Sequence, residues 1–510
     1  MQWLNQIVDE IISRKPTGEI IVSSGVSPSG QYHVGTLREV LTADAVLIEI
    51  RRRGRKAKHL HFVDDHDRFR KIPVGIPKEY EKYLGMPLRN VPSPDPKYKS
   101  YADYYLDDFE SNIKILGIDV ELIRTSDMYD KGVFSEAIEK TLENIDQLRR
   151  ILEKVSGMKL DESWSPIQIV EDSYLKKRVF VSLDKKAKNI TYKDSENIDQ
   201  TTSYENGNVK LDWRTDWPAR WWIYGVDIEP FGRDHATKGG SYDTGKEIIQ
   251  KIFGGKAPIP VPYDFINRSG DTKKMSKSEG NTVTITELLQ VLPPEIVRFF
   301  VLRYAAKKLL FFDQSDGVVR LIDDYAELLA KPEKTPDEEQ MITIVSSTIA
   351  TSSISNVPFS HLVASYQSAL KDSAKTIEII KRTEHGNIAE SQKAVIEKEL
   401  VYIDKWLKEW ASENVKFELA KKVSASDFNS VETKFLRDLA DKISLAPKDA
   451  DGEWFHEAMY QLKQESGLEP KELFGIIYRV LIQKTSGPRA GWFLSILPRA
   501  WLIARLKLEA

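Results

Sequence analysis

Two stretches of the sequence combine residue types that handle phosphate groups. The first, GVSPSGQYHVGT (25–36), holds three glycines, a proline and one histidine. The backbone beside Gly30 and Gly35 can approach phosphate oxygens closely, and His33 can donate a further hydrogen bond to them. The second, RSGDTKKMSKSEGN (268–281), places three lysines between two glycines and has no apolar periodicity. Its charge suits phosphate oxygens, although a solvated surface loop would have the same composition.

The residues around the first stretch predict the elements that hold it. Apolar residues 20–22 indicate a buried strand, and apolar positions recur at helical spacing from 37 to 48. A second strand is predicted in KAKHLHFVDD (56–65), which completes a β-α-β unit with parallel strands. We expect this pattern to be interrupted by an insertion, to resume near residue 208 with tight turns and strands, and to give way to helices after about residue 293.

Composition and charge exclude several classes of protein. The 510 residues are 41% hydrophobic and 30% charged, which fits a globular chain of several domains. The chain has no cysteine, so disulfides, thiolate catalysis and cysteine-based zinc sites are excluded, and no structural zinc is expected. Asp9 and Glu10 interrupt the first apolar stretch, so it is no signal peptide, and no run predicts a membrane span. We expect a cytoplasmic protein without membrane association.

Charge and histidine spacing give no clear site of their own. The net charge of −3 provides no global attraction to nucleic acid, so binding would need local patches such as EIRRRGRKAK (49–58), which also suits a solvated helix end. His59, His61 and His66 lie close together, but their spacing favours packing in a strand over a metal site.

The strings HVGT (33–36) and KMSKS (274–278) resemble the paired signatures of class I aminoacyl-tRNA synthetases. The resemblance implies a split Rossmann-like nucleotide-binding domain with an inserted α+β connective domain, followed by an all-α C-terminal domain. It implies catalytic roles for His33, Gly35, Thr36, Lys274 and Lys277. The implied ATP-binding residues are Pro28, Gly30, His33, Gly35, Met275, Ser276, Lys277 and Ser278. Thr36 departs from the His-Ile-Gly-His pattern of the family and removes one imidazole.

Further strings, among them DDHDRFRK, PFGRDH and SYDTGKEI, are similar to the archaeal-type class I lysyl-tRNA synthetases. Ser23 stands where glutamyl enzymes of this branch carry an arginine for the substrate carboxylate. A lysine ammonium instead needs a carboxylate and aromatic walls, for which Glu39 and Asp64 are candidates. The resemblance implies that Gly25, Ser27, Trp213 and His235 line the lysine pocket.

Each of these residues also has a structural interpretation. Thr36 and Glu39 match a Thr-x-x-Glu capping box, so Glu39 could serve the helix rather than the substrate. Two or more of the tryptophans between 213 and 222 are expected to be core residues. In the C-terminal region Trp492 and Phe493 could stack on unpaired bases, with Arg489 on phosphate, or pack in the core.

The resemblance implies ATP and Mg²⁺ as cofactors, and L-lysine and tRNA(Lys) as partners. The domains are expected to be the first half of the catalytic domain (1–75), the connective insertion (76–207), the second half with the KMSKS loop (208–292), a helical stem-contact region (293–335) and an anticodon-binding domain (336–510). Glutamyl-tRNA synthetase and a non-catalytic RNA-binding protein derived from a synthetase stay as alternatives. The sequence indicates neither the oligomeric state nor whether activation requires tRNA.

Overall fold

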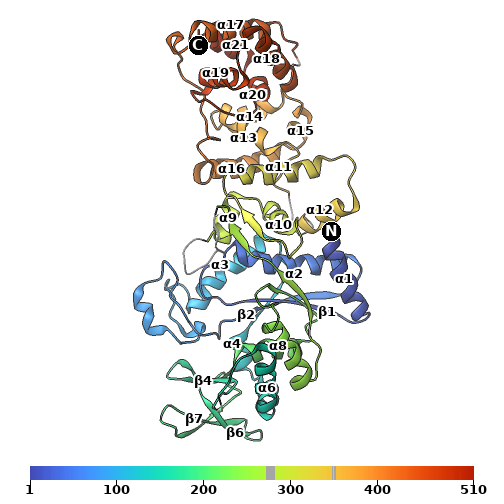
Figure 1. Cartoon of the computed structure of the whole chain (residues 1–510), viewed down its shortest axis with the longest axis vertical. Coiled ribbons are helices and arrows are strands. Elements are labelled where there is room, and N and C mark those ends of the chain that lie inside the picture. Colours follow the sequence, from blue (N-terminus) through green and yellow to red (C-terminus); the bar gives the residue numbers. More distant parts are fainter. Residues whose placement is uncertain (162, 271–281, 347, 350–351, 449, 510) are drawn as a thin grey trace. The chain divides into compact units, whose positions relative to one another are not determined.

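The chain forms two compact units. The computed structural model describes residues 1–161, 163–270, 282–346, 348–349, 352–448 and 450–509. Unit 1 comprises Met1–Leu289, Val297–Phe312 and Thr335–Ile349, and unit 2 comprises Gln290–Ile296, Asp313–Lys334 and Ala350–Ala510. Unit 1 therefore holds the blue-to-green part of the chain in Figure 1 together with the light-orange helix α12 (Pro336–Ser346), and the other orange and the red helices belong to unit 2.

A five-stranded, all-parallel sheet forms the centre of unit 1 (Figure 1). Its strands, in spatial order, are β11 (Ile259–Tyr263), β10 (Ile228–Gly232), β1 (Ile20–Val26), β2 (Ala57–Val63) and β3 (Glu121–Arg124). The strand order reverses between β1 and β10, and the carboxyl ends of strands at such a switch point are where ligands bind in α/β sheets. The predicted α/β fold class is confirmed, with the strand-loop-helix unit at its centre.

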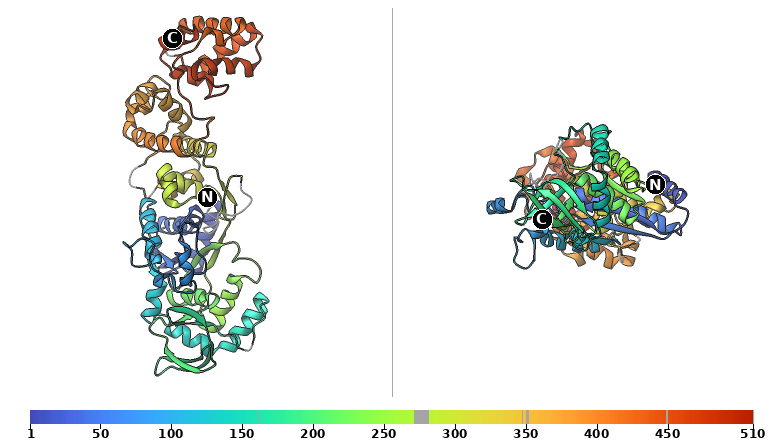
Figure 2. Two further views of the ribbon diagram at one scale, coloured as in Figure 1. Left: turned by 90° about the vertical axis from the view of Figure 1, so that its left-hand side faces the viewer. Right: turned by 90° about the horizontal axis from the view of Figure 1, so that it is seen from below.

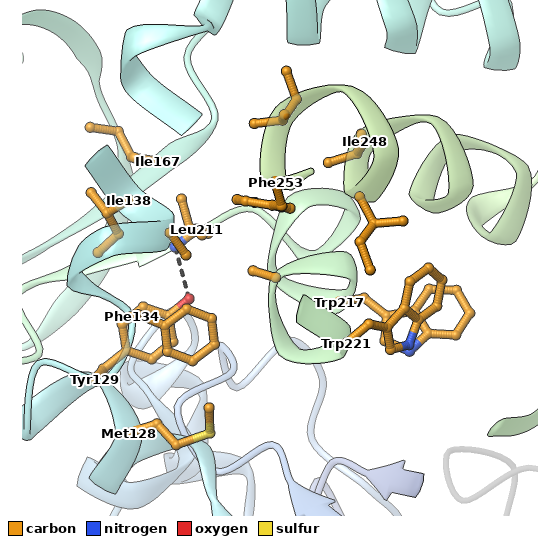
Figure 3. Close-up of a cluster of buried hydrophobic side chains, with 14 of the residues drawn as sticks. Met128, Tyr129, Phe134, Ile138, Ile167, Leu211, Trp217, Trp221, Ile248 and Phe253 are labelled. Atoms are coloured by element: carbon orange, nitrogen blue, oxygen red, sulfur yellow. Dashed lines mark hydrogen bonds between the residues drawn. The ribbon is translucent and has the colours of Figure 1, made fainter. Parts of the chain in front are cut away.

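Helices cover the sheet on both sides. Helix α2 (Val34–Arg52) packs against β1, β2 and β10. Figure 1 shows α8 (Ser241–Ile248) on the other side of the strands, continued by the π-helical turn Ile249–Phe253. On that side, sheet residues such as Phe62 and Phe231 join Trp217 and Trp221 of α7 (Trp213–Tyr224) in one buried cluster, part of which is drawn in Figure 3.

The other elements of unit 1 lie around this core. Helix α1 (Gln2–Arg14) packs on α2 and β11. Between β2 and β3 come two 3₁₀ turns (Lys78–Tyr83 and Leu88–Asn90) and α3 (Tyr101–Ile115). The helices that follow are α4 (Thr125–Asp130), α5 (Ser135–Glu143) and α6 (Ile145–Ser156). Two antiparallel sheets follow, β5-β4-β9 with β4 (Ile167–Glu171), β5 (Tyr174–Lys177) and β9 (Val209–Leu211), and β6-β7-β8 with β6 (Val179–Asp184), β7 (Asn189–Lys193) and β8 (Asp199–Ser203).

Two domain boundaries and one secondary-structure assignment differ from those expected. Strand β3 belongs to the central parallel sheet although it lies within the predicted insertion 76–207. Residues 213–224, expected among tight turns and strands, form the helix α7. Strand β13 (Leu310–Phe312) pairs with β12 (Ile266–Arg268), and α12 (Pro336–Ser346) belongs to unit 1 rather than to a C-terminal domain beginning at 336.

Two buried arginines explain why these late segments join unit 1. The Arg38 side chain, on α2, donates to the carbonyl oxygens of Val301, Ala305, Ala306 and Lys308. Arg298 forms a fully buried salt bridge with Asp44 of α2 at 2.7 Å. It also donates to the carbonyl oxygens of Leu116, Ile344 and Val345. Because burying an unpaired guanidinium is costly, these contacts hold residues 297–312 and 335–349 against α2.

Unit 2 is helical throughout its described residues (Figure 2). It includes the ends of α9 (Ile285–Val291) and α10 (Pro294–Leu302), which it shares with unit 1. Its own α-helices are α11 (Asp316–Ala330), α13 (Phe359–Ser368), α14 (Ser373–Ile380), α15 (Gly386–Ser391), α16 (Lys393–Glu409), α17 (Ser430–Ser444), α18 (Gly452–Ser466), α19 (Pro470–Ile482), α20 (Ala490–Ile496) and α21 (Arg499–Leu506), with a 3₁₀ turn at Ala425–Asp427. Among the helices described in either unit, none combines the length and apolar character that crossing a membrane requires.

Candidate active site at the carboxyl ends of the sheet

His33 caps α2 at its N-terminus. Its Nδ1 accepts a hydrogen bond from the Gly35 N–H at 3.0 Å. The ring lies so close to Gly35 that an added Cβ would come within 2.7 Å of the His33 Cε1, so this cap requires glycine at position 35. Because Nδ1 accepts, the neutral ring carries its proton on Nε2. Capping and phosphate binding are therefore compatible in His33, since they use different ring nitrogens.

The predicted Thr36–Glu39 capping box is wrong. Helix α2 begins at Val34, which places Thr36 inside the first turn, where its N–H donates to the His33 carbonyl oxygen at 2.8 Å. The sequence signal failed because a histidine with a neighbouring glycine caps the helix one turn earlier. Glu39 is thereby left to make contacts elsewhere.

The residues that follow the lysine-rich loop pair with the HVGT segment. His33 and Thr284 form an antiparallel bridge. The Val34 N–H donates to the Val283 carbonyl oxygen at 3.0 Å, and the Ile285 N–H donates to the Tyr32 carbonyl oxygen at 3.2 Å. The HVGT segment is therefore joined to the described residues that follow the KMSKS string in the sequence.

The loop is also anchored at its beginning. The parallel pair β12–β13 ends at Arg268, and the next N–H, of Ser269, donates to the Phe312 carbonyl oxygen at 2.9 Å. The predicted loop residues Lys274, Met275, Ser276, Lys277 and Ser278 lie outside the described residues. Both of the described segments that flank them are held by backbone hydrogen bonds.

Glu39 joins three elements at the carboxyl end of β1. Its Oε1 accepts from the Gly25 N–H at 2.7 Å, and its Oε2 accepts from the Tyr263 hydroxyl at 2.7 Å. The side chain is buried, and this burial raises the pKa of Glu39 to about 8 in spite of both hydrogen bonds. Within the described part of the chain Glu39 forms no ion pair, and a buried carboxylate without a cation is the group that a cationic ligand would stabilise.

Asp64 already has a cationic partner. Its Oδ1 lies 2.6 Å from Arg220 of α7, which also binds Asp216 at 2.5 Å. Lys210 completes this network through Asp216 at 3.0 Å and Asp67 at 3.3 Å. Desolvation raises the pKa of Asp64 to about 6, although Arg220 opposes this shift. Asp64 thus differs from Glu39 in having its charge balanced within the protein.

Trp213 and His235, both predicted to line the pocket, lie together. The ring centroids of Trp213 and His235 are 5.1 Å apart, and Trp213 stacks on Trp217 at 5.0 Å. Ser27 follows β1, and its hydroxyl reaches the Asp64 carbonyl oxygen at 3.5 Å. Gly25 lies at the carboxyl end of β1, Ser27 follows that strand, and His235 follows β10. Glu39 and Trp213 lie on α2 and α7, which pack beside the sheet. The structure therefore gathers these five residues near the carboxyl edge of the sheet. Pro28 and Gly30 are buried in the loop between β1 and α2.

The neighbouring histidines have structural partners. His59 Nε2 and His61 Nδ1 each lie 2.7 Å from the Ser24 hydroxyl. Burial lowers the pKa of each ring to about 3, so both are neutral. This confirms the predicted packing in a strand for His59 and His61, whereas His66 lies in the turn after β2. Among the residues that the structure describes, no three His, Cys, Asp or Glu side chains are grouped to hold a metal ion.

Sequence reasoning missed Tyr263, Arg220 and Glu229. Trp217 and Trp221, which are buried as predicted, donate through Nε1 to the two oxygens of Glu229. The spacing of the tryptophans at 213, 217 and 221 is helical and could have revealed α7. No local pattern indicates that Tyr263 or Glu229 faces this region. Tyr263 is 224 residues from its partner Glu39, and Glu229 lies on a different element from its tryptophan partners.

Unit 2 contains a separate cavity of about 430 Å³. Its lining includes His361, His385, Arg489 and Trp492. Phe493 is fully buried in the helical core, which agrees with its alternative interpretation as a core residue, whereas Trp492 is half-buried and faces the cavity. The alternation of buried and half-buried residues along the short helix α20 separates the two aromatic rings.

The comparisons with known proteins agree with this geometry. The family described as tRNA synthetases class I (K) matches residues 1–350. The chain belongs to this family. Among relatives of this class I synthetase, a lysine–tRNA ligase of Archaeoglobus fulgidus is 35% identical and covers 99% of both chains. A lysine–tRNA ligase of Pyrococcus horikoshii is 32% identical and covers 100% of both chains. A solved glutamate tRNA ligase of Elizabethkingia meningosepticum is 14% identical, covers 97% of this chain and all of its own, and has a TM-score of 0.43, too distant to bear on the amino acid.

Proposed function

We propose that this class I synthetase activates L-lysine with ATP and transfers it to the 3′ end of tRNA(Lys). The observation that carries this proposal is the buried carboxylate of Glu39, held by Gly25 and Tyr263 at the carboxyl end of β1. With the aromatic pair of Trp213 and His235, it provides the anion and the π faces that an alkylammonium side chain needs. A glutamate side chain would be repelled by the same carboxylate.

Activation requires no nucleophile from the protein. The lysine α-carboxylate attacks the α-phosphorus of ATP, forming the lysyl-adenylate, and the bond to pyrophosphate breaks. His33 Nε2 and the N-terminus of α2 would donate hydrogen bonds to the phosphates. Lys274 and Lys277 would neutralise the charge of the departing pyrophosphate. Mg²⁺ would enter as the ATP complex, because the described residues offer no cluster of ligands for it and magnesium is commonly held by substrate phosphates.

Asp64 is assigned a positioning role in this proposal instead of the ammonium contact considered from sequence. Its carboxylate is occupied by Arg220, whose second partner Asp216 lies on the same helix. The pair ties α7, which carries Trp213, to the end of β2. The Asp64 backbone carbonyl oxygen also accepts a hydrogen bond from the Ser27 hydroxyl. Asp64 thus holds the pocket in shape while Glu39 supplies the charge.

Unit 2 would bind the tRNA away from the acceptor end. Its cavity presents Trp492 beside Arg489, which is exposed at the start of α20. An aromatic ring with a nearby guanidinium is suited to an unpaired base and its phosphate. The lysyl group would then pass from the adenylate to a hydroxyl of the terminal adenosine.

The test is ATP–pyrophosphate exchange with lysine and with glutamate, each with and without tRNA, followed by aminoacylation of tRNA(Lys). The proposal expects exchange and tRNA charging with lysine, and neither reaction with glutamate. Charging with glutamate would support the glutamyl alternative. Binding of tRNA without exchange under any of these conditions would support a non-catalytic RNA-binding protein.

A further inference from the structure

Two tryptophans donate hydrogen bonds to the buried acid Glu229. It lies on β10, is 5% exposed, and its Oε1 accepts from Trp217 Nε1 at 3.1 Å. Its Oε2 accepts from Trp221 Nε1. Figure 3 shows these two indoles side by side on α7, with their ring centroids 4.7 Å apart. An indole has a single donor and no acceptor, so each ring orientation depends on one carboxylate oxygen.

The two tryptophans have different neighbours. Trp217 stacks on Trp213, with centroids 5.0 Å apart and planes 24° apart, and lies 5.7 Å from His235. Trp221 instead contacts Tyr242, at 5.8 Å. Glu229 is therefore linked through Trp217, but not directly through Trp221, to the aromatic wall of the proposed lysine pocket.

No cation of the described residues is in direct contact with the charge of Glu229. Among the described residues Glu229 forms no salt bridge, because Arg220 is paired with Asp64 and Asp216. Ser23 lies beside Glu229 on the neighbouring strand, as the pairing of Val22 with Ile228 requires. The Ser23 side chain and the nearby charge of Arg220 both oppose the rise in the pKa of Glu229, but Ser23 itself supplies no positive charge. Burial raises the pKa of Glu229 to about 7, and the charge of Glu229 in turn raises the pKa of Glu39. A carboxylate kept here without a counter-ion is expensive unless a cation binds nearby.

We infer that Glu229 is a specificity-determining positioning residue, which fixes Trp217 and thereby the Trp213–His235 wall in the orientation that accepts a long cationic side chain. Its negative charge also disfavours an anionic amino acid in the same pocket. Apart from this effect of its charge, Glu229 acts through Trp217, and it has no part in the chemistry of activation. This inference rests on the proposed function, since it concerns the amino acid that the pocket selects.

Three variants separate positioning from general packing. Glu229→Gln keeps the shape but leaves a single acceptor oxygen for two indoles. Trp217→Phe and Trp221→Phe each remove one N–H donor to the Glu229 carboxylate from a buried position. They differ because Trp217 contacts Trp213 of the aromatic wall, whereas Trp221 contacts Tyr242. For each variant, the KM values for lysine and ATP, the discrimination against norleucine and glutamate, and the melting temperature are measured.

Positioning predicts a specific pattern. Glu229→Gln and Trp217→Phe should raise the lysine KM at least tenfold while the ATP KM changes less than twofold. Glu229→Gln should also narrow the preference for lysine over glutamate. Trp221→Phe should lower the melting temperature and leave the lysine KM within twofold of the wild type.

Other outcomes overturn the inference. A folded Glu229→Gln enzyme with unchanged lysine KM and discrimination would remove Glu229 from specificity. Equal shifts in lysine KM for Trp217→Phe and Trp221→Phe would indicate that both tryptophans contribute only by packing. These two variants decide the question if Glu229→Gln does not fold. A wild-type enzyme without lysine-dependent exchange would overturn the proposed function together with this inference, whereas a lysine-active wild type with neutral variants would overturn the inference alone.

Discussion

Thr284 lies opposite His33 in an antiparallel bridge, so the chain returns from the lysine-rich loop directly onto the residue that caps α2. The flanking hydrogen bonds, from Val34 to Val283 and from Ile285 to Tyr32, hold this contact. The described residues that follow the lysine-rich loop are therefore held beside the N-terminus of α2, and the proposed action of both on the ATP phosphates relies on this contact.

Lys277→Ala should lower the rate of amino-acid activation at least tenfold, equivalent to about 1.4 kcal/mol of transition-state stabilisation. The reason is that the lysine would neutralise charge that develops as pyrophosphate leaves. The tRNA affinity should be nearly unchanged. Single-turnover activation and tRNA binding are measured on the same preparation.

Lys273→Ala is the matched control, because it removes the same charge from the same loop at a position outside the KMSKS string. It should retain most of the activation rate. Equal losses in both variants would indicate a general effect of loop charge, and unchanged kinetics for Lys277→Ala would remove this lysine from the mechanism.

Gly35→Ala should disrupt the cap of α2, because the new Cβ would meet the His33 ring at 2.7 and 2.8 Å. Displacing the ring removes the Gly35–His33 hydrogen bond, and loss of an N-terminal cap costs about 1 kcal/mol of unfolding free energy. Activation should fall as well, since the donor on Nε2 moves with the ring. Urea unfolding and exchange kinetics measure the two effects.

The double variant with His33→Ala tests whether the clash is the cause. Without the imidazole, the added methyl group at position 35 meets no ring, so Gly35→Ala should cost little further stability in that background. If the two losses simply add, the glycine is needed for another reason, such as the approach of a ligand to the backbone.

The elements that could be predicted from sequence are those fixed by local pattern. The β1–α2–β2 unit follows from apolar strands around a glycine-rich turn. His33 and Gly35 lie where this turn meets the helix. Strand β3 was missed because its four residues are exposed or half-buried and carry no apolar run. The attachment of residues 297–312 and 335–349 to unit 1 depends on Arg38 and Arg298, whose partners are carbonyl groups that no side-chain pattern reveals.

The same distinction applies to the site. Glu39 was a candidate because of its charge near the turn, but its partner Tyr263 comes from a different strand. Asp64 looked equivalent to Glu39 in the sequence, yet Arg220 balances the charge of Asp64 and not that of Glu39. Which of two acids is neutralised depends on tertiary contacts, so residue type and spacing could propose both without choosing between them.

The raised pKa of Glu39 predicts how lysine use depends on pH. With the pKa at about 8, Glu39 must lose a proton to pair with the lysine ammonium, which is itself charged in this range. Lysine kcat/KM should therefore rise about tenfold per pH unit from about pH 6 to 8 and level off above that. The neighbouring Glu229, Asp64 and Tyr263 also face this group, so the profile is compared with that of Glu39→Gln, in which the Glu39 titration is absent.

Stability without lysine should change in the opposite direction. The folded state keeps the Glu39 proton up to about pH 8, whereas the unfolded chain releases it near its ordinary value of 4.5. This contribution to stability is present below pH 4.5 and is lost as the pH rises toward 8. Thermal unfolding of wild type and Glu39→Gln over this range should differ most at alkaline pH. An identical pH dependence in the two proteins would contradict the assignment.

Asp64→Asn and Glu39→Gln should separate structural from substrate contacts when they are compared side by side. Asp64→Asn removes one charge of a buried pair with Arg220, and breaking such a pair costs about 3 to 5 kcal/mol of unfolding free energy. Its melting temperature should therefore fall clearly, while the preference for lysine over the uncharged analogue norleucine stays close to that of the wild type. Glu39→Gln should lose that preference by orders of magnitude, because the anion that faces the ammonium is gone. A loss of preference in Asp64→Asn as large as in Glu39→Gln would instead make Asp64 the ammonium partner, with Arg220 displaced when lysine binds.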